Sequence, residues 1–235
     1  MRILKSLVVA ILISTAFSCA NQKADVKVLE TEIDSASYAL GMDMAIKVKQ
    51  NFKEANTDMF LQGYRNTMDS TNMLIDQKDL GMFLRTFFQK QQMEKQKEMA
   101  AKNFSENKKA GEKFLAENKT KEGVITTESG LQYIVLKEGT GRKPQPTDTI
   151  KINYHGTTIN GDVFDSTIRR NKPYVSKANV FVPGFNEALL NIKVGGKHKV
   201  FIPQELAYGF QQRGQLIKPY SPLVFEIELL EITND

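Results

Sequence analysis

The chain is poor in the residues from which metal and redox sites are usually built. Its 235 residues include no tryptophan, one cysteine and two histidines. A single cysteine excludes an intramolecular disulfide, and His155 and His198 are too few donors for a zinc site. His155 has no evident serine or cysteine partner for a catalytic triad, and no glycine-rich phosphate loop is present. We therefore expect no metal and no cofactor.

Arginine-rich patches are also missing. The formal net charge is +5, but many of the lysines lie between residues 89 and 118, where glutamates are interleaved with them. Such a stretch is typical of a solvated helix face rather than a nucleic-acid groove. No nucleic-acid partner is expected.

Residues 1–18 have the pattern of a secretory signal. Arg2 and Lys5 precede an apolar run that is too short to span a bilayer, and small residues follow it. Cys19 ends this segment, as in the lipobox of bacterial lipoproteins. We expect an exported protein of the bacterial cell envelope, in the periplasm or at the outer membrane, lipid-anchored through Cys19 on a flexible tether at 19–30. A plain signal peptide that contains a cysteine is the alternative.

Methionine and proline divide the remaining chain in two. All nine methionines lie at or before Met99, and all seven prolines lie at or after Pro144. Proline breaks helix interiors, whereas methionine favours helices and fills irregular gaps. The front of the chain should therefore be helical, and the rear should consist of strands and loops.

The front part, residues 31–122, is predicted to be all-α. Apolar residues recur at helical spacing after Ile33, after Thr57-Asp58 as an N-cap, and after Asp76 as another. One long connecting helix over 83–118 is expected to form an exposed spacer.

Within that spacer, Gly111 is expected to be a weak point, since glycine costs about 1 kcal/mol relative to alanine in a helix. The apolar faces of residues 30–90 are rich in Met and Phe. We predict that they pair with a second copy in a homodimer. A helical minidomain packed on the rest of the chain is the alternative.

The rear part, residues 123–235, changes to the periodicity of strands. Alternating apolar and polar residues predict strands at 131–136, 149–154, 199–202 and 223–232. One short helix is expected at 186–194, between proline-glycine and glycine-glycine pairs. The predicted fold class is α+β, with an antiparallel sheet, one helix laid across it, and the all-α arm in front.

Aromatic and branched residues gather near the turns of this rear part. They are Tyr154, Phe164, Tyr174, Phe181, Val182, Phe185, Tyr208, Ile217 and Phe225. Each of them alone fits a core position, because a domain without tryptophan needs its phenylalanines inside. Several nevertheless lie in loops or at element ends, where aromatics tend to line pockets. These residues therefore indicate an apolar pocket.

Five separated motifs of the rear part resemble, in order and spacing, those of FKBP-type peptidyl-prolyl isomerases. They are YHG at 154–156, GDVFDS at 161–166, VPGF at 182–185, IPQELAYG at 202–209 and LVFEIELL at 223–230. The helical front is similar to the dimerising arm of the macrophage-infectivity-potentiator and FkpA branch of this family.

The resemblance implies a half-barrel sheet wrapped on one helix, with a proline pocket between them. It places Phe185 at the pocket floor, where the family usually has tryptophan, and Tyr208 where a hydroxyl bonds a substrate carbonyl. It places Asp165 beside the twisting amide, with Arg170 as its ionic partner. Tyr154, Asp165, Phe185 and Tyr208 are the implied catalytic residues. The implied substrate-binding residues are Phe164, Arg170, Tyr174, Phe181, Val182, Ile217 and Phe225.

Asn160-Gly161 is expected to turn the chain between Tyr154 and Asp165. With the turn there, these two residues form two sides of the pocket. A hairpin whose polar residues face solvent is the alternative.

The implied activity fits the missing nucleophile. Rotation about an Xaa-Pro bond has a barrier of about 18–20 kcal/mol, but no covalent bond has to be made or cut. An enzyme needs only to bind the twisted amide more tightly than either planar form. We expect Arg170 and the Tyr154 hydroxyl to stabilise Asp165, because an unpaired buried carboxylate is costly. That Asp165 only organises its loop is the alternative.

Three functions of different classes are compatible with the sequence. The resemblance favours a prolyl isomerase that acts on unfolded or exported proline-containing polypeptides. Macrolides are then expected inhibitors, with binding weakened by Phe185 in place of tryptophan. The second hypothesis is a non-catalytic chaperone that holds clients with its helical arm. The third is a purely structural envelope lipoprotein.

Overall fold

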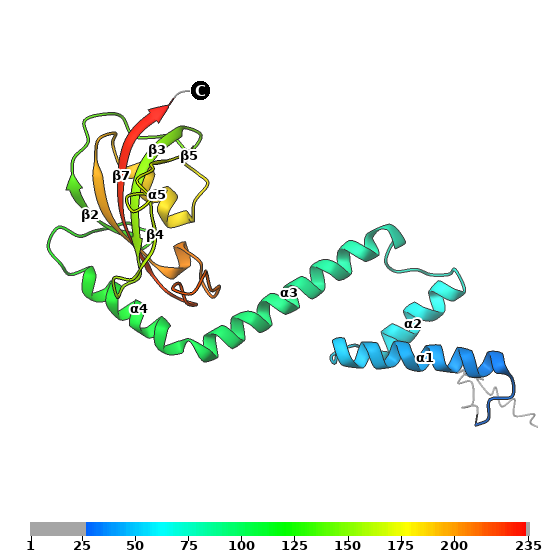
Figure 1. The fold of residues 1–235 in the computed structure, drawn as a ribbon. Coiled ribbons are helices and arrows are strands. Elements are labelled where there is room, and N and C mark those ends of the chain that lie inside the picture. The colour runs from blue at the N-terminus through cyan, green and yellow to red at the C-terminus, as the bar shows by residue number, and fades with distance from the viewer. Residues whose placement is uncertain (1–26, 234–235) are drawn as a thin grey trace, which may run out of the picture. The chain divides into compact units, whose positions relative to one another are not determined.

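The chain divides into two compact units, which are described separately. The computed structural model describes residues 27–233 (Figure 1), so the predicted signal segment and Cys19 lie outside the described residues. The first unit ends at Asp76 and the second begins at Gln77. In residues 27–233, no helix combines the length and the apolar character needed to cross a membrane.

The first unit contains α1 (Glu32–Asn51) and α2 (Thr57–Met68). A capping box begins α1. The Asp34 N–H donates to the Thr31 hydroxyl, and the Thr31 N–H donates to the Asp34 carboxylate, both at 3.0 Å. No residue of either helix is buried.

The cap of α2 lies one residue before the predicted position. The Asn56 side chain, rather than Thr57-Asp58, accepts the hydrogen bond from the Met59 N–H at 3.1 Å. Asparagine is among the best N-cap residues, because its short side chain reaches the free N–H groups of the first turn.

The predicted single helix over 83–118 is wrong, because the second unit begins with two helices. They are α3 (Gln77–Asn103) and α4 (Ser105–Asn118), and Phe104 between them leaves the helical conformation with φ −120° and ψ 24°. Figure 1 shows the chain changing direction there. The break lets α4 lie against the sheet of the same unit.

The prediction of an exposed spacer is wrong for α4. Gly111 and Asn118 are buried, and the Asn118 amide donates to Gln132 Oε1 at 2.9 Å. A Cβ on Gly111 would lie 2.7 Å from the Pro222 Cδ atom. α4 therefore approaches the rest of the unit closely at Gly111, where a side chain has no room.

An antiparallel sheet forms most of the rest of the second unit, as predicted, but it has seven strands where the sequence pattern indicated four. The strands are β1 (Ile125–Thr126), β2 (Gln132–Lys137), β3 (Thr149–Thr157), β4 (Val163–Ser166), β5 (Tyr174–Lys177), β6 (Lys197–Ile202) and β7 (Leu223–Thr233). Their order is β1-β2-β6-β7-β3-β4, and β5 also pairs with β3. Every pair is antiparallel.

One helix, α5 (Pro183–Asn191), packs on this sheet, and a single 3-10 turn, η1 (Gln204–Leu206), follows β6. The helix starts earlier than predicted because Pro183 occupies its first turn, where a missing N–H has no cost. Leu189 of α5 is fully buried, as are Ile152 and Ile227 of the sheet. The core therefore lies between α5 and one face of the sheet.

Candidate active site

A cavity of about 470 Å³ opens beside α5 in the second unit. Its lining residues are Tyr154, Phe164, Asp165, Val180, Phe181, Val182, Phe185, Tyr208, Ile217 and Phe225. Nine of the ten are aromatic or aliphatic, and Asp165 is the only carboxylate among them. The cavity is thus an apolar pocket with one acid in its wall.

Strands β3 and β4 bring Tyr154 and Asp165 together. The two strands pair with Gly156 opposite Asp165. The predicted turn between them is present: Gly161 has φ +90°, and its N–H donates to the Thr158 carbonyl at 3.0 Å. Glycine adopts this conformation at little cost, so the turn suits the sequence. Both residues line the pocket, which favours the pocket over the solvent-facing alternative.

The hydrogen bonds expected around Asp165 are present. The Tyr154 hydroxyl donates to Asp165 Oδ2 at 2.6 Å, and the Arg170 Nη1 donates to Asp165 Oδ1. Arg170 Nη2 also donates to the Tyr154 hydroxyl at 3.3 Å. Both carboxylate oxygens therefore have a donor, and the charge is balanced by the guanidinium.

These contacts shift the protonation equilibria. Burial would raise the pKa of Asp165, but the hydrogen bonds from Tyr154 and Arg170 outweigh it and hold that pKa below its usual value. Burial raises the pKa of the Tyr154 hydroxyl, and its hydrogen bond to Asp165 raises it further. At neutral pH the site thus holds a carboxylate, a guanidinium and a neutral phenol.

Phe185 is the most deeply buried of the residues that line the pocket. Only 2% of its surface is exposed, and its ring centroid lies 4.5 Å from that of Phe181 and 4.9 Å from that of Phe225. The ring of Tyr154 meets it edge-on at 5.9 Å. Such edge-to-face packing holds aromatic side chains in fixed orientations.

The first turn of α5 explains why these side chains converge. Val182 is its N-cap residue, so Phe181 and Val182 arrive from the loop and Phe185 from the helix. The Asn186 side chain fixes the loop, because it accepts from the Phe181 N–H and donates to the Phe181 carbonyl, both at 3.0 Å.

The opposite side of the pocket comes from the segment between η1 and β7. Tyr208 and Ile217 both line the cavity. Arg213 and Ile217 form an isolated β-bridge, and the Arg213 guanidinium lies 5.2 Å from the centroid of the Tyr208 ring. This segment thus places a phenol and an aliphatic side chain opposite α5.

Two family models match the chain. Residues 33–135 match the domain amino-terminal to FKBP-type peptidyl-prolyl isomerase, and residues 140–230 match the FKBP-type peptidyl-prolyl cis-trans isomerase itself. The outer membrane protein MIP of Legionella longbeachae is 35% identical over 226 residues, covering 96% of this chain and 97% of that protein. The chain belongs to the FKBP-type peptidyl-prolyl isomerases.

Further similarities extend over most of the isomerase. FkpA of Aeromonas hydrophila, also an FKBP-type peptidyl-prolyl cis-trans isomerase, is 36% identical over 217 residues, covering 89% of this chain and 79% of that protein. The crystal structure of FkpA from Escherichia coli matches with a TM-score of 0.52 and 30% identity, covering 88% of this chain and 99% of that one. The predicted family, fold class and enzyme class are confirmed, and a purely non-catalytic chaperone is not favoured.

Two residues predicted for the isomerase pocket do not line the cavity but contact residues that do. Arg170 reaches Asp165 without lining the cavity, and Tyr174 contacts the rings of Tyr154 and Phe181 at 6.4 and 5.8 Å. Val180 lines the cavity although its motif did not include it, and 57% of it is exposed. Its position directly before Phe181 was the only available signal.

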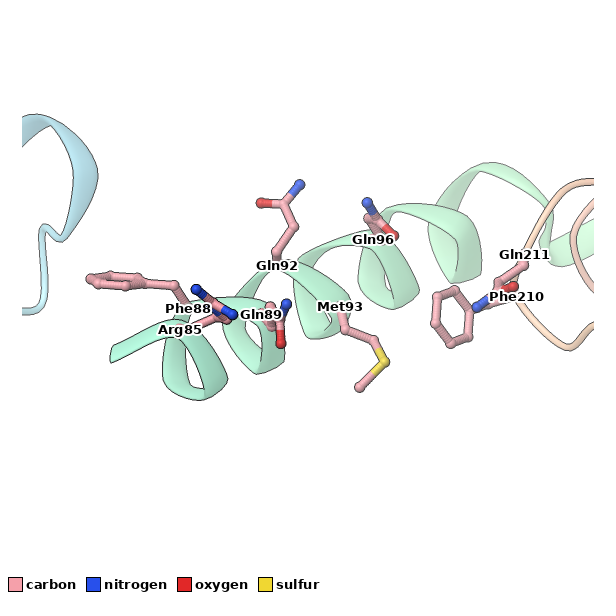
Figure 2. Close-up of a pocket in the computed structure, with 8 residues that line it drawn as sticks. All are labelled: Arg85, Phe88, Gln89, Gln92, Met93, Gln96, Phe210 and Gln211. Atoms are coloured by element: carbon pink, nitrogen blue, oxygen red, sulfur yellow. The ribbon is translucent and has the colours of Figure 1, made fainter. Parts of the chain in front are cut away.

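The isomerase has a second hollow, of about 560 Å³, along one face of α3 (Figure 2). It is lined by Arg85, Phe88, Gln89, Gln92, Met93, Gln96, Phe210 and Gln211. Four of these eight side chains are glutamine amides, and no carboxylate is among them. Its lining of amides thus differs from that of the smaller, apolar pocket, which holds the residues that the sequence predicted for the site.

Proposed function

We propose that the apolar pocket binds the proline of an Xaa-Pro segment and lowers the barrier to rotation about the preceding peptide bond. The observation that carries this proposal is the lining of aromatic and aliphatic side chains around a single carboxylate that is already hydrogen-bonded. Such a pocket lacks the nucleophile that covalent chemistry needs, and amide rotation does not require one.

The physical basis is a difference in solvation. A planar amide is polarised by resonance and is well solvated by water, whereas a twisted amide has lost much of that polarisation. A pocket without water therefore favours the twisted form relative to the planar forms. A rate gain of about 10⁴–10⁶ corresponds to a barrier lowered by about 5–8 kcal/mol.

The family resemblance, together with the positions of the side chains, supports a role for each residue. We assign the pocket floor to Phe185 and the walls to the rings of Tyr154 and Phe225, which lie 5.9 and 4.9 Å from it. We assign to the Tyr208 hydroxyl a hydrogen bond to a substrate carbonyl, and to Asp165 a place beside the twisting amide. Arg170 keeps Asp165 ionised. Macrolides would occupy the same pocket, with an affinity lowered by the missing indole N–H.

A protease-coupled isomerisation assay tests the proposal. The purified chain at micromolar concentration should accelerate cis-trans conversion of short peptides with several different residues before proline. Asp165→Asn removes the charge and keeps the shape, so we expect kcat/KM to fall about 3- to 10-fold. A chain no faster than buffer with every peptide would show that the proposed activity is wrong.

We also propose that the isomerase works on polypeptides outside the cytoplasm, tethered through a lipid on Cys19. The signal pattern at 1–18 supports this, and a relative named an outer membrane protein is 35% identical over nearly its whole length. Changing Cys19→Ser should move the exported protein from the membrane fraction to the soluble fraction. Unchanged membrane association would contradict the lipid anchor and leave export itself standing.

Dimerisation through residues 30–90 is proposed from the helices of the first unit. Neither α1 nor α2 buries a residue, and 66% of Leu40 and 50% of Ile46 are exposed. Exposed apolar side chains on a helix favour burial against another surface, and we propose that a second copy of the chain supplies that surface. Residues 123–235 are then proposed as the isomerase domain, and residues 31–122 as the arm and connector.

Light scattering checks the dimer. At tens of micromolar the exported chain should have twice the mass of one copy, and the double change Leu40→Lys and Ile46→Lys should give a monomer. Lys47→Ala on the same helix changes an exposed residue and serves as the control. A wild-type monomer at that concentration would contradict the proposal.

A further inference from the structure

The segment 208–222 supplies Tyr208 and Ile217 to the pocket, and we call it the pocket loop. It contains no named helix or strand, since η1 ends at Leu206 and β7 begins at Leu223. Its shape depends on a few hydrogen bonds. The Tyr220 N–H donates to the Gly209 carbonyl at 2.7 Å and closes the base of the loop.

The base of the pocket loop is held from outside by α4. Asn107 donates from Nδ2 to the Pro219 carbonyl at 2.6 Å and to the Ser221 hydroxyl at 3.1 Å. These two acceptors flank Tyr220 in the sequence. One amide thus fixes both neighbours of the residue that closes the loop.

Tyr220 contacts both α3 and α4. Its hydroxyl donates to the Lys97 carbonyl of α3 at 3.3 Å, and the Lys108 Nζ of α4 lies 5.8 Å from the ring centroid. Only 8% of its surface is exposed. The side chain therefore lies buried at the junction of α3 and α4.

The backbone of Tyr220 is in an unfavourable conformation. Its φ is +63°, in the left-handed region that a bulky side chain rarely adopts. Such a conformation persists only where surrounding contacts impose it, and it tends to occur near functional sites. Here the contacts come from Lys97 and Asn107, which lie outside the pocket loop.

Gly111 allows α4 to pack closely on the pocket loop. A Cβ at Gly111 would lie 2.7 Å from the Pro222 Cδ and 3.5 Å from the Tyr220 carbonyl oxygen. Pro222 is the last residue of the pocket loop. The close packing of α4 on the loop therefore depends on the glycine.

We propose that the junction of α3 and α4 positions the active site, with Asn107 as the main positioning residue. Asn107 holds Pro219 and Ser221, and these two residues hold Tyr220 between them. The Tyr220 N–H in turn closes the loop on Gly209, which is next to Tyr208. Ile217 lies two residues before Pro219 and is set by the same contacts. The inference rests on the proposed function of the pocket, since it makes the connector part of the catalytic unit rather than a spacer.

The test compares two asparagines of α4 in the full chain. Asn107→Ala removes both hydrogen bonds to the pocket loop. Asn118→Ala is the matched control, because the side chain of buried Asn118 donates to Gln132 of β2 and not to the pocket loop. We expect Asn107→Ala to lower kcat/KM about 5- to 10-fold, mainly through KM, while the wild-type value is kept in Asn118→Ala despite a lower melting temperature.

Two further measurements separate positioning from general stability. Asn107→Asp has the same size but no amide donor, so it should behave like Asn107→Ala. Trypsin cleavage after Arg213, at the tip of the pocket loop, should become several-fold faster in both Asn107 variants and stay unchanged in Asn118→Ala.

The outcomes are distinguishable. Cleavage and KM that remain at wild-type values in the Asn107 variants would overturn the proposal, as would equal losses of activity in the Asn107 and Asn118 variants. A wild-type chain without isomerase activity would contradict the proposed function alone, because the rate of cleavage at Arg213 reports on the loop without any catalysis.

Discussion

Phe185→Ala is expected to lower kcat/KM for proline peptides by about 100-fold and the free energy of unfolding by about 3–5 kcal/mol. The side chain is 2% exposed and touches the rings of Phe181, Phe225 and Tyr154. Its removal leaves a cavity under the proline site that its neighbours cannot fill without moving. Water can then solvate the planar amide, which removes the preference for the twisted form.

Urea denaturation and the protease-coupled assay measure the two effects. Ile150→Ala is the matched control, because Ile150 is fully buried in the same core but does not line the pocket. The free energy of unfolding of Ile150→Ala should fall by a similar amount, about 2–5 kcal/mol. Its kcat/KM should equal that of the wild type at a temperature where the variant is folded. Equal catalytic losses in both variants would mean that Phe185 acts only through stability.

Phe185→Trp extends the same series to macrolides. Tryptophan restores an indole N–H at the floor, so macrolide inhibition should become stronger while isomerase activity is retained. Overpacking against Phe181 and Phe225 should cost about 1–3 kcal/mol of stability. Inhibition equal to that of the wild type would contradict the role given to the missing donor.

Gly156→Val is the second change with a large expected effect, because Gly156 keeps the pocket open. A Cβ there would lie 2.6 Å from the Phe225 ring and 2.8 Å from the Phe164 ring. Both rings line the cavity, so they must move into it or distort the sheet. We expect KM to rise at least 10-fold and stability to fall by about 1–3 kcal/mol.

Peptide kinetics and thermal unfolding check this prediction. Gly81→Ala is the control, since a Cβ at that glycine of α3 meets no atom within 4 Å. It should leave KM unchanged and raise stability slightly, because alanine favours a helix. A Gly156→Val protein with wild-type KM would show that the two rings do not depend on this gap.

The sequence was sufficient where local pattern decides structure. Alternation of apolar and polar residues located β2, β3, β6 and β7, because successive side chains of a strand point to opposite faces: Ile150 and Ile152 of β3 are buried, and Lys151 between them is not. The short strands β1, β4 and β5 were not predicted. The pairing of Asp165 with Tyr154 and Arg170 was also predictable, since the family resemblance indicated the partners and a partly buried carboxylate needs donors.

Other features depend on contacts between distant residues. No glycine or proline near Phe104 marks the end of α3. The helix ends there because α4 packs on the pocket loop, where Asn107 contacts Pro219 and Gly111 contacts Pro222. Gly111 is a weak point by helix propensity alone, but the close contact with Pro222 requires a residue without a side chain at this position. Gly156 has no local signal of its role, and Val180 has only its position directly before Phe181. Their importance comes from what other strands and loops place beside them.

The position of β7 has a consequence for how the protein is made. β7 is the last of the seven strands along the chain, yet it lies between β6 and β3 in the sheet and pairs with both. Before it is synthesised, the two halves of the sheet share no partner, and contacts between residues so distant in sequence form slowly. The sheet of this domain therefore cannot be completed until its last strand has been synthesised.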